Sequence, residues 1–182
     1  MHMFEDEDIK IFGGKKIENE ADVLIRVVEI MKKQRANGNM DRAKEMGEVI
    51  AERVYQLMTE AEIPESNANI SDQIEKLITF TVEAELHVLL EKYSVSTVAV
   101  NAFYDKLIEL DENLYNNITD AYTYYYLVLR KGGDVATGIG KQFAKLCSAK
   151  DDQAMELSGR DIFNNVCEIL KDEIEKAEFV NN

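Results

Sequence analysis

The chain has 182 residues with one proline, nine glycines and 46% hydrophobic side chains, so it can bury a core and favours long helices over turns. Its 21 basic residues against 35 acidic ones give a formal net charge of −14, which repels nucleic acids and anionic membranes. Two cysteines without a CxxC pair and no long apolar run argue against a disulfide framework and a transmembrane helix. We therefore expect a cytoplasmic, all-α protein with no nucleic-acid and no membrane partner.

Residues 1–16 carry an acidic cluster and are expected to form a flexible N-terminal tail, followed by one helical domain over residues 17–182. The spacing of apolar residues predicts a first helix over residues 18–36. Its apolar stripe consists of Val23, Leu24, Val27, Val28 and Met31. An Asn-Gly-Asn turn at residues 37–39 ends this helix.

A second helix is predicted from a cap at Asp41 to about residue 61, and a third over residues 71–93. Ser94 or Ser96 is expected to cap the fourth helix. Three more helices are predicted over residues 111–130, from a cap at Asp134 to Leu146, and over residues 152–178. Seven helices with short connections indicate a single bundle or a short array of helical hairpins.

One pattern of small residues occurs twice. Asp41, Ala43, Gly47 and Ala51 recur at the same spacing as Asp134, Ala136, Gly140 and Ala144. A small residue at every fourth position makes a smooth strip that another helix can approach closely. The pattern is explained either by a duplicated helical hairpin or by two capped helices that acquired similar close-packing faces.

Four of the eight tyrosines lie within five positions, at 122, 124, 125 and 126. Residues 122–129 also fit a buried strand by propensity, but the chain offers no partner strand, so a helix is predicted. On that helix a first stripe is assigned to the core and consists of Ile118, Tyr122, Tyr125 and Leu129. A second stripe contains Tyr115, Tyr126 and Arg130, and Tyr124 lies between the two.

Tyrosine and arginine are enriched at the centres of protein interfaces. We therefore interpret Tyr115, Tyr124, Tyr126 and Arg130 as a face that binds a protein partner or a second copy of the chain. The alternative is that all these rings fill the core of a chain without tryptophan.

The spacing Glu45-x-x-Glu48 resembles the magnesium-binding helix of all-helical nucleotide pyrophosphatases of the MazG type. That resemblance implies a magnesium ion held on a nucleoside triphosphate, with Glu45 and Glu48 as two of four carboxylate ligands. The second half of the family's pattern, Glu-x-x-Asp on the next helix, is absent from this sequence. Residues 133–141 lack the spacing of a phosphate loop, and His87 has no second ligand histidine near it.

These observations favour a non-enzymatic, acidic helical interaction or scaffold protein with no cofactor and no catalytic residues. Two alternatives stay open. One is a magnesium-dependent nucleotide pyrophosphatase that uses Glu45 and Glu48, and the other is an acidic inhibitor or immunity-type protein that binds a basic partner.

Overall fold

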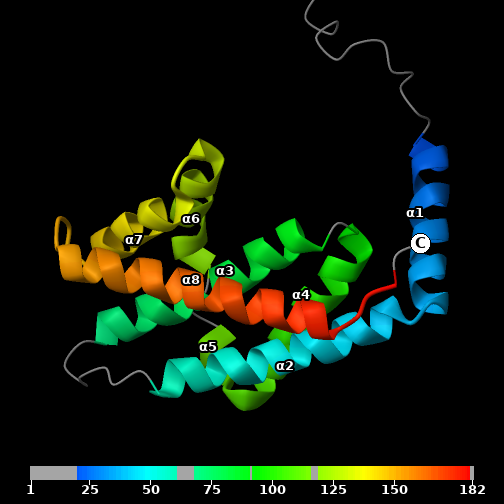
Figure 1. Cartoon of the computed structure of the whole chain (residues 1–182), viewed down its shortest axis with the longest axis horizontal. Helices are drawn as coiled ribbons and strands as arrows, with labels where there is room; N and C mark the ends of the chain where they lie inside the picture. Colours follow the sequence, from blue (N-terminus) through cyan, green and yellow to red (C-terminus); the bar gives the residue numbers. More distant parts are fainter. Residues whose placement is uncertain (1–19, 61–67, 91, 116–118, 181–182) are drawn as a thin grey trace, which may run out of the picture.

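The structure, a computed structural model, describes residues 20–60, 68–90, 92–115 and 119–180 (Figure 1). Its helices are α1 (Glu20–Ala36), α2 (Asn39–Glu60), α3 (Ala68–Leu89), α4 (Tyr93–Leu110), α5 (Glu112–Tyr115), α6 (Thr119–Lys131), α7 (Val135–Leu146) and α8 (Gln153–Lys176). Within the described residues α5 is a single turn, the other seven helices are longer, and there is no strand. The all-α prediction with seven helices is therefore confirmed, whereas the predicted tail over residues 1–16 lies outside the described residues.

Aspartate caps start the last two helices. The cap at Asp134 is confirmed, and Asp152 caps the last helix at its predicted start. The Asp134 carboxylate accepts a hydrogen bond of 3.1 Å from the backbone N–H of Thr137. Asp152 accepts one of 2.9 Å from the backbone N–H of Ala154. Each bond satisfies a backbone donor that the first turn of a helix leaves without a partner.

Two other predicted helix starts are wrong. Helix α2 begins at Asn39, two residues before the expected cap at Asp41, because Gly38 turns the chain at once with φ at +79°. Helix α4 begins without a side-chain cap, so neither Ser94 nor Ser96 has the predicted role. Ser96 is buried inside the first turn of α4.

Two buried apolar clusters form the core. The first lies between α2, α4 and the later part of α8, and its members include Ile50, Val54, Phe103, Leu107 and Leu170. The second lies between α6, α7 and the earlier part of α8, and its members include Tyr125, Ile139, Phe143 and Phe163. Helix α3 contributes to both clusters, with Val82 in the first and Phe80 in the second. The two halves of the molecule therefore share α3 and α8.

The repeated pattern of small residues marks the closest helix contacts. A Cβ at Gly47 would overlap the carbonyl oxygen of Ala99 in α4, and one at Gly140 would overlap that of Glu156 in α8. The expected close approach is therefore confirmed at both positions. The partner helices lie at different places in the chain, however. Helix α2 packs mainly on α4, the second helix after it, whereas α7 packs mainly on α8, the next helix. This difference favours similar packing faces over a duplicated hairpin.

The apolar stripe of α1 is not buried in the structure. All five residues of its predicted apolar stripe are exposed, and among the described side chains of α1 only Gln34 is buried. In Figure 1, α1 stands upright at one edge of the molecule and meets it at the C-terminal end of the helix. None of the described helices is long and apolar enough to cross a membrane.

Candidate functional site

The tyrosine-rich segment forms α6, which rises from the body of the molecule and packs against α3 and α7 (Figure 1). The single helix predicted over residues 111–130 is divided into α5 and α6, and residues 116–118 between them lie outside the described residues. Tyr125 is fully buried, and Tyr122 and Leu129 are half-buried, in agreement with the predicted core stripe. Ile118 lies outside the described residues.

Phe80 of α3 holds α6 in place, because its ring contacts three tyrosines. The ring centres of Tyr122 and Tyr126 lie 5.4 and 5.0 Å from that of Phe80, both in edge-to-face geometry. The ring of Tyr125 lies 5.1 Å away at a tilt of 33°. Aromatic pairs in these geometries stabilise a fold beyond the area that they bury. Helix α6 is therefore fixed firmly by its inner face.

The outer face of α6 is aromatic and apolar. Tyr124 and Leu127 are each 49% exposed, Tyr126 is 39% exposed, and Arg130 is exposed in the last turn. The side chain of Tyr115, the fourth residue of the predicted face, lies outside the described residues. We name Tyr124, Tyr126, Leu127 and Arg130 the α6 face.

The phenols behind the α6 face are held by Glu83 of α3. Tyr104 donates a hydrogen bond of 2.7 Å to the Glu83 carboxylate, and its hydroxyl lies 2.9 Å from that of Tyr122. Tyr126 donates a longer bond of 3.5 Å to the same carboxylate. Burial raises the pKa of both Tyr104 and Tyr122, so these phenols stay neutral and act as donors. The network fixes the back of the α6 face and contains no activated nucleophile.

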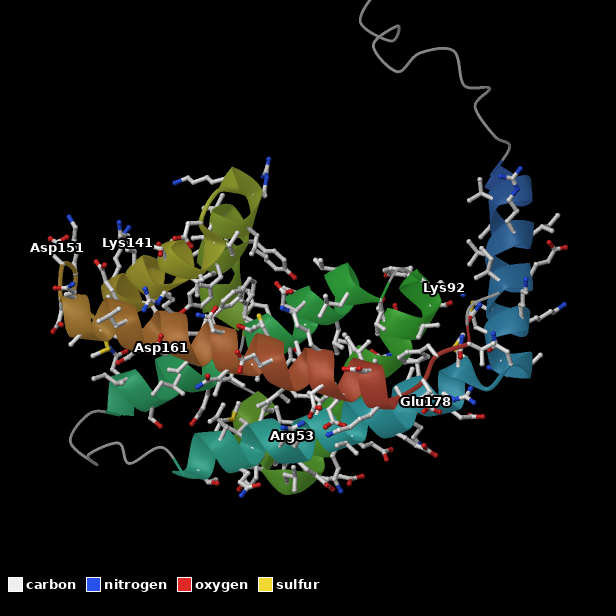
Figure 2. All side chains as sticks on the ribbon, in the orientation of Figure 1. Arg53, Lys92, Lys141, Asp151, Asp161 and Glu178 are labelled. Carbon is white, nitrogen blue, oxygen red and sulfur yellow. The ribbon has the colours of Figure 1, made fainter. Side chains whose placement is uncertain are left out.

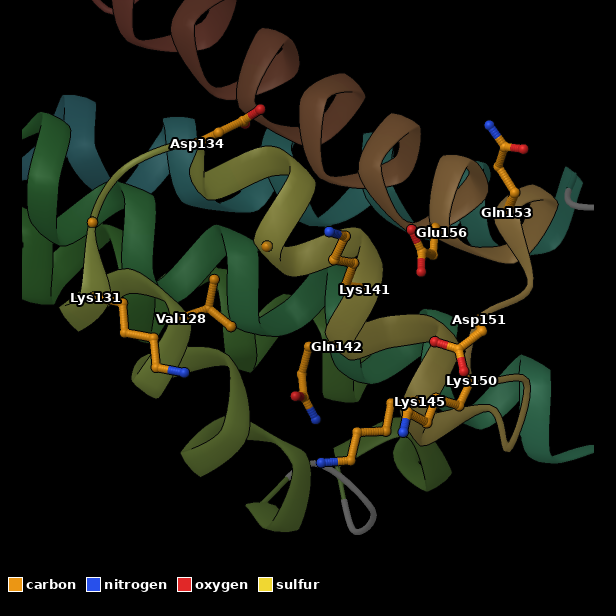
Figure 3. A pocket seen from close by; sticks show the side chains of 12 residues that line it. Val128, Lys131, Asp134, Lys141, Gln142, Lys145, Lys150, Asp151, Gln153 and Glu156 are labelled. Carbon is orange, nitrogen blue, oxygen red and sulfur yellow. The ribbon is translucent and has the colours of Figure 1, made fainter.

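A hollow of about 620 Å³ lies beside α6, between the end of that helix, α7 and the start of α8. Four lysines line it (Figure 3): Lys131 comes from α6, Lys141 and Lys145 from α7, and Lys150 from the loop before α8. Three acids also line it, namely Asp134, Asp151 and Glu156. Figure 3 shows Lys131, Gln142 and Lys145 around one side of the hollow.

The lysine hollow is unusual in so acidic a chain. Lys131, Lys145 and Lys150 form no ion pair with any residue that the structure describes. Lys141 lies near Asp134, whose pKa is lowered mainly by hydrogen bonds from Thr137 and further by this lysine. Val128 and Lys131 of α6 line the hollow, so α6 contributes residues both to the hollow and to the α6 face.

Glu45 and Glu48, the carboxylates of the alternative metal site, lie on the surface of α2. Glu48 pairs with Lys44 at 3.7 Å, and Glu45 lines a shallow hollow with Glu173 and Glu178. Glu173 is already bound by Arg53 and Lys176. Among the described residues, no group of three or more histidines, cysteines or acids is placed to hold a metal ion.

The surroundings of His87 and of the two cysteines are typical of side chains with a structural role. The His87 ring is exposed, as expected, stacks on Tyr93 and lies 2.9 Å from the Ser96 hydroxyl. Cys147 is buried and Cys167 is half-buried, and burial raises their pKa values to about 11 and about 12. Both thiols therefore stay protonated near neutral pH and are poor nucleophiles.

Compared with known proteins, the chain matches no family model, no curated protein and no solved structure.

Sequence reasoning missed part of this surface. Leu127 was not assigned to the interaction face, although it lies three residues after Tyr124 and shares its side of the helix. The lysines of the hollow were missed because they are spread over residues 131–150. The available signal was local charge, since few other segments of this acidic chain contain four lysines in 20 residues.

Proposed function

We propose that this chain is a non-enzymatic helical interaction protein and that a protein partner docks on the α6 face. The observation that supports the proposal is the exposure of Tyr124 and Leu127 on a helix whose inner face is fixed on Phe80. A fixed helix loses little conformational entropy on binding, and tyrosine offers a large contact area with few rotatable bonds. Exposed apolar surface of this kind is typical of interaction sites.

The chemistry of the surface indicates what the partner carries. An apolar anchor fits the side chains of Tyr124 and Leu127, and acidic side chains fit the lysine hollow at the end of the same helix. The rest of the molecule is strongly acidic, which steers an acidic partner toward this end. The proposed partner is therefore a protein segment with both acidic and apolar residues.

The experiment is site-specific photo-crosslinking in cells that make the protein, with a photoreactive amino acid at Tyr124. The matched control places the same amino acid at Leu157, an apolar residue of α8 that is 40% exposed. We expect a discrete crosslinked product at Tyr124 and none at Leu157. Mass spectrometry of that product identifies the partner, which is then purified.

Binding of the purified partner is measured by calorimetry with Tyr124→Ala and with Tyr93→Ala as a second exposed tyrosine. We expect Tyr124→Ala to weaken binding at least about tenfold, the effect of a typical hot spot, and Tyr93→Ala to leave it unchanged. Lys145→Glu should weaken binding more at low salt than at high salt. At high salt, the attraction between the lysines and the partner's acidic residues is already screened. Equal effects of the two tyrosine substitutions would contradict the proposal.

A further inference from the structure

A second surface, separate from the α6 face, lies on α1. Seven large apolar side chains of this helix are at least 41% exposed, namely Val23, Leu24, Ile25, Val27, Val28, Ile30 and Met31. Most of α1 stands apart from the other described helices, and its side chains project on both sides of the helix (Figure 2). A helix of 17 residues is marginal in water when nothing packs along it. We therefore expect the exposed apolar side chains of α1 to be covered by a binding partner.

The C-terminal end of α1 is anchored to the body of the molecule. The side-chain amide of Asn39 donates to Gln34 at 2.7 Å and to the carbonyl of Val180 at 3.0 Å. The backbone N–H of Val180 donates in return to the Asn39 side-chain oxygen at 2.9 Å. Gln34 and Asn39 are both buried. These bonds fix the direction of α1, so its apolar face is presented in a defined orientation.

The distribution of charge on α1 indicates which molecule covers its apolar side chains. Helix α1 carries four bases against three acids, a net charge of +1, whereas the whole chain carries a net charge of −14. Two copies of the chain repel one another through their acidic surfaces, and this repulsion is weaker at α1. The bases gather at one end, with Lys32, Lys33 and Arg35 near the C-terminus of α1, and its sequence opens with Glu-Ala-Asp. A parallel pair of α1 helices would bring the basic ends together, and an antiparallel pair separates them.

We propose that two copies of this chain form a dimer by packing their α1 helices antiparallel. Leu24, Val28 and Met31 follow the four-and-three spacing of a helix–helix seam. When the two-fold axis passes between Val27 and Val28, Leu24 of each copy lies opposite Met31 of the other. The basic end of each helix then lies beside the acidic start of its partner. The surface is self-complementary, and it leaves the α6 face free for another protein.

Sedimentation equilibrium of the full chain between about 5 and 300 μM is the first test. Two short helices bury less area than a standard interface, so we expect a dimer with a dissociation constant on the order of micromolar. Leu24→Glu places a charge in the seam and should weaken dimerisation at least about tenfold. Leu157→Glu, at an apolar residue of α8 that is also exposed, should leave it unchanged.

Disulfide formation under mild oxidation tests the register. Val28→Cys should crosslink with itself, because it lies at the crossing point. Two Leu24→Cys chains should not, since their cysteines lie about 10 Å apart along the pair, beyond the reach of a disulfide. An equimolar mixture of Leu24→Cys and Met31→Cys chains should crosslink to each other. The unaltered chain controls for Cys147 and Cys167.

Several results would overturn the proposal. One is a monomer at every concentration, and another is a dimer that Leu24→Glu leaves intact. Efficient self-crosslinking of Leu24→Cys would show a parallel pair and refute the antiparallel register. Binding of a monomeric chain to phosphatidylserine vesicles, lost in Leu24→Glu, would assign the α1 face to a lipid surface instead.

Discussion

The hydroxyls of Tyr104 and Tyr125, two tyrosines near α6, have opposite surroundings. The Tyr104 hydroxyl bonds Glu83 and Tyr122. The hydroxyl of Tyr125 is buried, and no described residue forms a hydrogen bond with it. A buried polar atom without a partner loses its hydration and gains nothing in return, whereas a satisfied one contributes to stability. The aromatic ring of Tyr125 thus stabilises the core at the expense of its own hydroxyl.

Removing each hydroxyl should therefore change stability in opposite directions. We expect Tyr125→Phe to raise the free energy of unfolding by up to about 1 kcal/mol, and Tyr104→Phe to lower it by about 1–2 kcal/mol. Urea denaturation followed by circular dichroism measures both. The two variants control for each other, because each removes one oxygen from a tyrosine near α6. A loss of stability in Tyr125→Phe would show that its hydroxyl has a partner.

At the scale of elements, glycine sets how closely α7 approaches its neighbours. Gly140 faces the backbone of α8, where a Cβ would overlap the carbonyl of Glu156. Gly138 lies half a turn away and faces only a side-chain methyl of Val128 in α6. Backbone cannot move without shifting a helix, but a methyl group can turn aside.

We predict that Gly140→Ala is less stable than Gly138→Ala by about 1–3 kcal/mol, the usual cost of overpacking. Both substitutions gain the same helix propensity, about 1 kcal/mol, so their difference isolates the collision with α8. Urea denaturation of the two variants measures the difference between their free energies of unfolding. Equal stabilities would mean that α7 and α8 separate at little cost.

How far the sequence predicts the fold depends on what each pattern encodes. The cap at Asp134 and the buried Tyr125 were predictable, because hydrogen bonding and helical spacing act within one element. The exposure of α1 was not, since periodicity shows that apolar residues share a face but not whether another helix covers it. The lysine hollow also could not be foreseen, because its side chains come from separate elements that only the tertiary fold brings together.

At the scale of the whole molecule, the two apolar clusters are joined by the helices that they share. Helices α3 and α8 pack against each other and contribute to both clusters. Arg53 of α2, labelled in Figure 2, adds an ion pair of 2.7 Å with Asp172 of α8 and another with Glu173. Without α3 and α8, neither cluster would be enclosed by helices on all sides. The two halves should therefore unfold together.

Core truncations in the two clusters test this cooperativity. Ile50 lies in the first cluster and Ile139 in the second, and both are fully buried. We expect Ile50→Ala and Ile139→Ala each to lower the free energy of unfolding by about 2–5 kcal/mol. Each should shift one common transition, seen at the same urea concentration by circular dichroism and by tyrosine fluorescence, because α3 and α8 lose their packing on both sides at once. Two separate transitions, with each substitution shifting only one of them, would show instead that the halves are independent domains.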